Sequence, residues 1–269
     1  MQGLPDFFVD KPPQKTCWLM FKAASLERLN QMRNGLLYLN SLDYFSKLAG
    51  EESIALRKDE LETVYGVLRA GPVPGGEAKF LLKVGDDGKE IDLGPAAVLT
   101  ASFPRPRNYM LFCMGAFADG KDGVIPGERD GKLHFDSRFL SFGTHMLLIT
   151  NAPEFGRRLS SAIAKTSGLF RSDYFHEGYG LVEYRDLATY SGAKGLFIKD
   201  LRYSWQNEFR IVLGAEDHLL NQRGGLELQI GSIEDISQIV SIQALLDTPI
   251  SITRRRFRMV DGKPEPVED

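Results

Sequence analysis

Short apolar runs recur along the whole chain, and few helical patterns separate them. About nine runs are typical of β-strands, and about three or four segments have helical spacing. The most apolar strand candidate is NYMLFCMGAF at 108–117. Because the helices do not alternate regularly with the strands, a doubly wound parallel sheet is disfavoured. The pattern predicts an α+β fold with a mainly antiparallel or mixed sheet and a few short helices.

The 269 residues allow one large domain or two small ones, and the chain shows no internal repeat or convincing linker. We expect a single α+β domain with insertions over 16–259. An irregular N-terminal arm over 1–15 precedes it, and a flexible, polar tail over 260–269 follows it. Inside the domain, a charge-rich stretch at 46–64 is typical of a solvated helix or a mobile excursion, and KFLLKV and KEIDL predict a hairpin.

A net charge of −3 gives no overall positive field that would favour nucleic acid as the main partner. Cys17 and Cys113 lie among apolar residues, as buried thiols in a reducing compartment do. No Cys or His pair has zinc-ligand spacing, so we expect no metal site. Apolar runs fall short of the ~20 residues of a membrane helix. The N-terminus lacks secretory features. These observations predict a cytoplasmic protein with no membrane partner, and they leave its oligomeric state open.

The segment RYSWQNEFRIVL at 202–213 carries the main site hypothesis. If it is extended, Gln206, Glu208 and Arg210 point to one face. The Q-x-E pattern resembles the motif of ADP-ribosyltransferases, which use NAD as a substrate. The resemblance implies that Glu208 stabilises the oxocarbenium-like cation as nicotinamide leaves, which favours the transition state. Gln206 would then orient the acceptor, and Arg210 would set the charge state of the carboxylate.

The first forty-five residues are also similar in layout to the start of those transferases, with a strand, a helix and a second strand. The resemblance implies that Tyr38, Ser41 and Tyr44 hold nicotinamide and its ribose, and that Lys22 contacts phosphate. The family's first strand normally ends in Arg or His, so Lys22 departs from the pattern and lacks the bidentate fork. The acceptor would be a protein or a nucleic acid.

A purely structural interpretation of the same residues stays open. In it, Glu208 lies on the polar face of an edge strand and pairs with Arg210 or Lys199. The tyrosines are then ordinary packing residues. The chain also resembles an uncharacterised family of bacterial and phage proteins in LYLNSLDYF, HEGYGLVEY and a late E-F-R strand. That resemblance implies a common fold and a setting in conflict between phage and host, without a reaction.

Other polar clusters each have a functional and a structural interpretation. His176 and Glu177 precede Gly178 and suit either acid–base chemistry or a surface loop. Arg105, Arg107 and Asn108 stand just before the 108–117 strand, where such groups grip phosphate or carboxylate or form a solvated loop.

A late strand is predicted at 250–259, with Arg254, Arg256 and Arg258 on one face. Such a face binds a nucleic-acid backbone or protects a sheet edge from aggregation. The alternative to the transferase is therefore a non-catalytic binding protein that recognises a protein or nucleic-acid partner.

Overall fold

The computed structural model describes residues 17–47, 61–73, 76–85, 88–120, 124–172, 178–253, 257–260 and 263–266. The fold is α+β with mainly antiparallel sheets, as the order of the apolar runs predicts. The expected N-terminal arm lies outside the described residues. Within the expected tail, β23 (Lys263–Pro266) pairs with β22 (Phe257–Val260). This part of the tail is therefore a strand. The expectation of a flexible tail rested on its polar composition, which does not prevent the backbone from pairing with a neighbouring strand.

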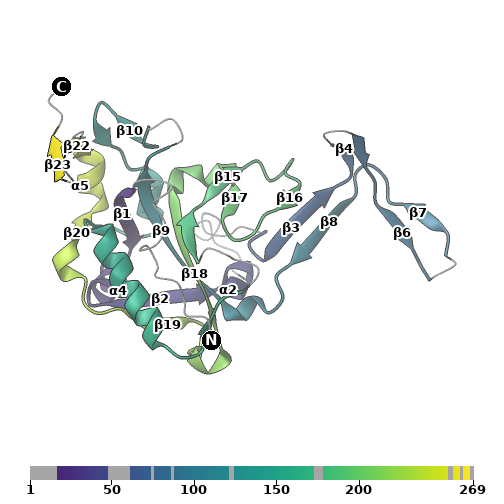
Figure 1. Ribbon diagram of the computed structural model, residues 1–269, viewed down its shortest axis with the longest axis horizontal. Coiled ribbons are helices and arrows are strands. Elements are labelled where there is room, and N and C mark those ends of the chain that lie inside the picture. The colour runs from purple at the N-terminus through teal and green to yellow at the C-terminus, as the bar shows by residue number, and fades with distance from the viewer. Residues whose placement is uncertain are drawn as a thin grey trace.

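A nine-stranded antiparallel sheet forms the body of the molecule (Figure 1). The strands are β1 (Cys17–Ala24), β2 (Leu36–Ser41), β9 (Tyr109–Ala118), β12 (His145–Ile149), β13 (Leu169–Phe170), β14 (Tyr179–Leu181), β18 (Glu208–Ala215), β19 (Leu226–Gln229) and β20 (Ser237–Ser241). The central strand is β9, the predicted apolar run. It pairs with β18 along one edge and with β1 and β2 along the other.

The alternation of side chains along β9 divides the core into layers. Met110, Phe112 and Met114 enter the main core cluster, which also contains Phe155 and Leu159 of helix α4 (Ala152–Lys165). Helix α1 (Leu26–Arg33) contributes to the same cluster. We call this side of the sheet the helix face and the other side the loop face.

Two separate apolar clusters cover the loop face. The phenylalanine cluster is built around Phe21, Phe117, Phe135 and Phe139. The second cluster lies at the start of β9 and consists of Leu42, Phe103, Tyr109, Leu111, Leu196 and Val212. The space between them is where the polar residues of the site lie.

Shorter elements surround the main sheet. They are α2 (Leu42–Lys47), α5 (Ile242–Asp247), β10 (Glu128–Arg129), β11 (Lys132–Leu133), β15 (Glu183–Arg185), β16 (Gly192–Ala193), β17 (Ile198–Asp200) and β21 (Ile250–Ser251). Strands β15 and β17 form a parallel pair. The segment 178–186 contains two strands, β14 and β15, which are separated by Val182 and belong to different sheets.

A long β-ribbon projects from the body (Figure 1). We define the projecting ribbon as the described residues between 64 and 102. Its strands are β3 (Val64–Arg69), β4 (Gly71–Val73), β5 (Gly76–Ala78), β6 (Leu81–Lys83), β7 (Glu90–Asp92) and β8 (Val98–Ser102). The β3–β8 pair, which β16 extends along β3, leads to two separate hairpins, β4–β5 and β6–β7. The β6–β7 pair is the hairpin predicted from KFLLKV and KEIDL.

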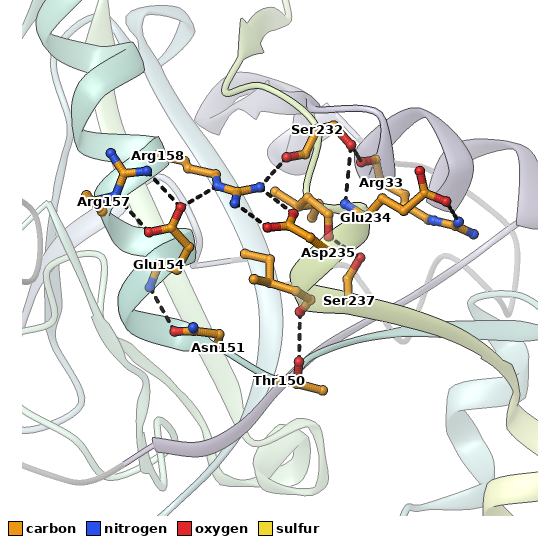
Figure 2. A network of polar contacts seen from close by, with 12 residues as sticks. Arg33, Thr150, Asn151, Glu154, Arg157, Arg158, Ser232, Glu234, Asp235 and Ser237 are labelled. Atoms are coloured by element: carbon orange, nitrogen blue, oxygen red, sulfur yellow. Dashed lines mark hydrogen bonds and ion pairs between the residues drawn. The ribbon is translucent and has the colours of Figure 1, made fainter.

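A polar network ties helix α4 to the chain segment before β20 (Figure 2). The Asn151 side chain caps the helix by accepting from the Glu154 N–H at 3.1 Å. Arg158 donates to Glu154 at 2.7 Å and to both carboxylate oxygens of Asp235 at 2.6 and 2.7 Å. It also donates to the Ser232 carbonyl oxygen. One guanidinium therefore joins the first turn of α4 to a segment about seventy-five positions later.

We expect Arg158→Met to lower the melting temperature more than Arg157→Met, its matched control. Arg157 also bonds Glu154 but is 64% exposed and makes no contact with the 232–237 segment among the described residues. Hydrogen bonds from Arg157 and Arg158 lower the pKa of Glu154 from 4.5 to about 2. This stabilisation is present above pH 4.5 and is lost as the pH falls towards 2. In thermal denaturation from pH 7 to pH 3, the melting temperatures of the wild type and Arg158→Met should converge as the pH falls. A constant difference between them would contradict a stabilising ion pair between Arg158 and Glu154.

Candidate functional site

The segment that carries the main site hypothesis is not extended throughout. Leu201–Gln206 form a short 3-10 helix, and Asn207 follows with left-handed backbone angles of φ 43° and ψ 49°. Asn tolerates this conformation better than most residues. Strand β18 begins only at Glu208, so strand alternation aligns Glu208 with Arg210 but not with Gln206. The turn at Asn207 nonetheless brings Gln206 close to Glu208.

Glu208 is only 5% exposed, and both of its carboxylate oxygens are engaged. One oxygen accepts from Arg210 Nε at 2.6 Å, and the other accepts from Lys199 Nζ at 2.8 Å. Lys199 also donates to Gln206 Oε1 at 3.0 Å. Glu208, Gln206 and Arg210 thus lie together, with Lys199 between the first two, and their catalytic roles stay a prediction.

Arg210 is 1% exposed and extends the network to a distant segment. It lies 2.7 Å from Glu62 Oε1 and donates to the Leu196 carbonyl oxygen at 2.6 Å. We define the ionic cluster as Glu62, Lys199, Gln206, Glu208 and Arg210. The pairing of Glu208 with Arg210 and Lys199 confirms one part of the structural interpretation. The edge-strand part is wrong, because β18 pairs with β9 on one side and with β13 and β14 on the other.

The ionic cluster lies on the loop face, between the two apolar clusters. Glu208 is opposite Gly115 on β9, and Arg210 is opposite Cys113. Burial alone would raise the pKa of Glu208, but the charges of Arg210 and Lys199 hold it well below its ordinary value of 4.5. Burial opposes the charge of Lys199 as well, yet its attraction to Glu208 raises its pKa. Glu208 is therefore a fixed counter-ion, not a group poised to exchange a proton.

Lys22 lies on the opposite side of the sheet from Glu208. Phe21 is opposite Gly115 on the loop face, so the next residue of β1 points to the helix face. There the Lys22 ammonium lies 4.9 Å from the centre of the Phe112 ring and donates to the Cys113 carbonyl oxygen. The structure does not bring Lys22 into a common pocket with the Glu208 carboxylate.

Of the three residues proposed to hold nicotinamide, Tyr38 is separated from the other two. Tyr38 contacts Gly225 and lines a cavity of about 270 Å³, and its hydroxyl is 3.4 Å from Asn221 Nδ2. Ser41 is three positions along β2 and thus points to the other face, where its Oγ accepts from the Tyr44 N–H at 3.1 Å. Tyr44 is 41% exposed and its ring contacts Phe45. Their contacts are local, and none of these contacts joins them to the ionic cluster.

Sequence reasoning missed two members of this neighbourhood. Glu62 stands in the charge-rich segment that predicts a solvated excursion, yet it is 3% exposed. Tyr184 is partly buried beside β18, where its hydroxyl accepts from the Glu208 N–H at 2.8 Å, and burial raises its pKa. Nothing in the sequence marks either residue, because Glu62 reaches Arg210 and Tyr184 reaches Glu208 only through tertiary packing.

The remaining candidates fall in two groups. His176, Glu177, Arg254 and Arg256 lie outside the described residues, and of Arg258 only the backbone, in β22, is described. Arg105 and Asn108 line the larger of two surface cavities, about 650 Å³ in volume. Arg107 is close by and lies 3.7 Å from Asp217.

We expect the Cys113 thiol to be almost inert in the folded protein. Burial and the nearby Glu208 carboxylate raise the pKa of Cys113 from 9.0 to about 12. Since the thiolate is the reactive form, alkylation at pH 8.5 should be at least about a hundredfold slower than in the unfolded chain. Iodoacetamide labelling of a Cys17→Ser variant, with and without denaturant, measures this ratio. Equal labelling in both conditions would show that Cys113 is not held beside a buried carboxylate.

Within the described ranges, no group of three or more His, Cys, Asp or Glu side chains is arranged to hold a metal ion. None of the helices in the same ranges has the length and apolar character needed to cross a membrane. Comparison with known proteins found no matching family model, no matching curated protein and no matching solved structure.

Proposed function

We propose that this protein acts by binding another protein, with the projecting ribbon as the contact surface. One observation carries the proposal: the β6–β7 hairpin of the ribbon, which extends away from the body (Figure 1), has an apolar face with exposed side chains. Leu82 and Ile91 are opposite each other in register and therefore share that face. They are 46% and 53% exposed.

The same face continues on both sides of this pair. The Leu93 N–H donates to the Phe80 carbonyl oxygen at 3.0 Å, and both residues fall on the Leu82 side by alternation. Val84, also on this side, is 71% exposed. The other face of the hairpin carries Leu81, Lys83, Glu90 and Asp92. An isolated two-stranded hairpin is marginally stable in water, and a contiguous exposed apolar face is typical of a protein-binding surface.

Charge favours a protein over a nucleic acid, the two kinds of partner that the sequence left open. Residues 64–102 contain four Lys or Arg and five Asp or Glu, so the ribbon has no positive field for a phosphate backbone. The outer edges of β6 and β7 have no strand beside them among the described residues. An unpaired edge beside an apolar face suits a protein chain that adds a strand and covers the hydrophobic side chains.

Site-specific photo-crosslinking tests the proposal. A crosslinkable residue at position 82 samples the apolar face, and one at position 83 is the matched control on the opposite face. We expect a protein captured from position 82 and not from position 83. Its affinity, measured with both proteins purified, should fall at least about tenfold in Leu82→Ser/Ile91→Ser. It should stay unchanged in Lys83→Ser. Equal capture from both faces, unchanged affinity, or capture only of a second copy of this chain would overturn the proposal.

The NAD-dependent ADP-ribosyltransferase is the second candidate, favoured by the proximity of Gln206, Glu208 and Arg210. The carboxylate would first have to leave Arg210 and Lys199 to meet a nicotinamide ribose, which the binding proposal does not require. Incubation with NAD separates the two functions. We expect no nicotinamide release from the wild type. Release that disappears in Glu208→Gln, with the variant still folded, would favour the transferase.

A further inference from the structure

The ribbon joins the body at a point where a buried carboxylate enters the ionic cluster. Glu62 stands two positions before β3 begins, is 3% exposed and lies 2.7 Å from Arg210 Nη1. The carbonyl oxygen of the next residue, Thr63, accepts from the Phe103 N–H at 2.9 Å, directly after β8 ends. The two chain ends of the ribbon are therefore side by side, and the Glu62 ion pair lies at this junction.

A second stretch of chain holds the ribbon along β3. Strand β16 pairs with β3, and the Arg69 side chain of β3 donates to the carbonyl oxygens of Leu187 and Tyr190 at 3.0 and 3.1 Å. The Arg69 backbone N–H donates to Ser191 Oγ at 3.1 Å. We define residues 187–196 as the side segment. The ribbon is thus attached to the molecule both at its junction and through the side segment.

One guanidinium contacts both attachments. Arg210 Nη1, which lies beside Glu62, also donates to the carbonyl oxygen of Leu196 in the side segment at 2.6 Å. The backbone of Arg210 is fixed within the main sheet, because it is opposite Cys113 on β9 and Gly180 on β14. Charge-assisted hydrogen bonds from a fixed guanidinium restrict the positions of both partners. The junction and the side segment are therefore located relative to the same point of β18.

The balance of buried charge favours this position of the junction. The buried charged side chains of the described residues are three cations and two carboxylates, namely Lys194, Lys199, Arg210, Glu62 and Glu208. Without Glu62, Glu208 would be the only carboxylate among them. Because a buried charge that loses its partner is strongly unfavourable, the Glu62 carboxylate stabilises the arrangement in which the junction lies against β18.

We infer that Glu62 and Arg210 are positioning residues for the ribbon: their ion pair sets the direction in which the β6–β7 hairpin extends from the body (Figure 1). The importance of that direction for binding rests on the proposed function. A ribbon held in one direction loses less conformational freedom when its partner binds, and the affinity is higher for that reason. Glu62→Gln keeps the shape of the side chain and removes its charge. In this variant the ribbon should sample several directions while the main sheet stays folded.

Pulsed electron–electron resonance with two pairs of spin labels tests the inference. The ribbon pair, at Lys83 and Ala164, joins the hairpin to α4, and the body pair, at Ala164 and Ala244, joins α4 to α5. All three side chains are exposed. The labels are attached through ketone-bearing residues, so the native cysteines stay in place. The matched control is Glu77→Gln, the same change at a 54% exposed ribbon carboxylate that lies 3.5 Å from Lys79.

We expect Glu62→Gln to broaden the distance distribution of the ribbon pair at least about twofold relative to the wild type and Glu77→Gln. The distribution of the body pair should not change. An unchanged ribbon pair in Glu62→Gln would overturn the inference. Broadening of both pairs, or loss of the folded structure, would overturn it as well, because the ion pair would then support the whole body instead of directing the ribbon.

These distances require no partner, so the inference and the proposed function fail separately. A ribbon that Glu62→Gln releases but that captures no protein would contradict the proposed function alone. If a partner is captured from position 82, its affinity for Glu62→Gln should be at least about threefold weaker than for Glu77→Gln. An unchanged ribbon pair together with a captured partner would contradict the inference alone.

Discussion

Arg210→Met should lower the free energy of unfolding by roughly 3–5 kcal/mol, because it leaves the Glu208 carboxylate buried without its nearest counter-charge. Arg210 is 1% exposed, and the variant also removes the partner of Glu62, which is 3% exposed. For a chain of this size the expected decrease in melting temperature is roughly 6–20 °C. Differential scanning calorimetry at pH 7 measures it.

The control for this substitution is Arg202→Met. Arg202 also pairs with a carboxylate, at 2.8 Å from Asp200, but its side chain is 72% exposed. Its replacement should change stability by at most about 1 kcal/mol. In the wild type, Glu208 stabilises the fold above its ordinary pKa of 4.5, and in Arg210→Met it should take up a proton as the pH falls. The wild type and Arg210→Met should therefore differ most in stability at neutral pH. Similar losses for both substitutions would mean that the ionic cluster does not support the fold.

Phe21→Ala should cost about 3–5 kcal/mol, since it empties the centre of the phenylalanine cluster. The Phe21 ring is fully buried, with the rings of Phe117, Phe135 and Phe139 at 5.1 to 5.3 Å between centroids. The ring also covers Gly115 of β9, where an added Cβ would lie 2.2 Å from it. Gly115→Ala alone should therefore cost about 1–3 kcal/mol through overpacking.

The double variant Phe21→Ala/Gly115→Ala provides the sharper measurement. Once the ring is gone, the extra methyl group has space, so Gly115→Ala should cost nothing further or recover part of the lost stability. Urea unfolding of the four proteins gives a coupling energy, expected at about 1–3 kcal/mol in the favourable direction. Additive losses in the free energy of unfolding would show that the Phe21 ring and Gly115 are not coupled.

How far the sequence predicts this fold depends on the range of the interactions involved. The apolar run in β9 and the β6–β7 hairpin are set by neighbouring residues, and each is found where the pattern places it. The stretch 202–206 is different. The alignment of Gln206 with Glu208 on one face assumed an extended segment, but residues 201–206 form a 3-10 helix, in which the Trp205 ring packs against Phe139.

The candidate site shows the same limit. The strand period of two residues suffices to predict that Glu208 contacts Arg210, since both lie on one face of the strand. Glu62 gives no such signal, because it becomes a buried partner only when the 61–64 segment packs beside β18. The residues of the 650 Å³ cavity come from three separate segments, and the sequence marks only Arg105 and Asn108 of the first.

The position of β9 has a consequence for biosynthesis. One edge of this strand is occupied by β1 and β2, which the ribosome makes first, whereas the other edge waits for β18. A nascent chain that has not yet emerged beyond residue 215 carries its most apolar strand with one side bare. Partial products should thus need chaperone protection until the last quarter of the chain is synthesised, and the sheet should close late and slowly.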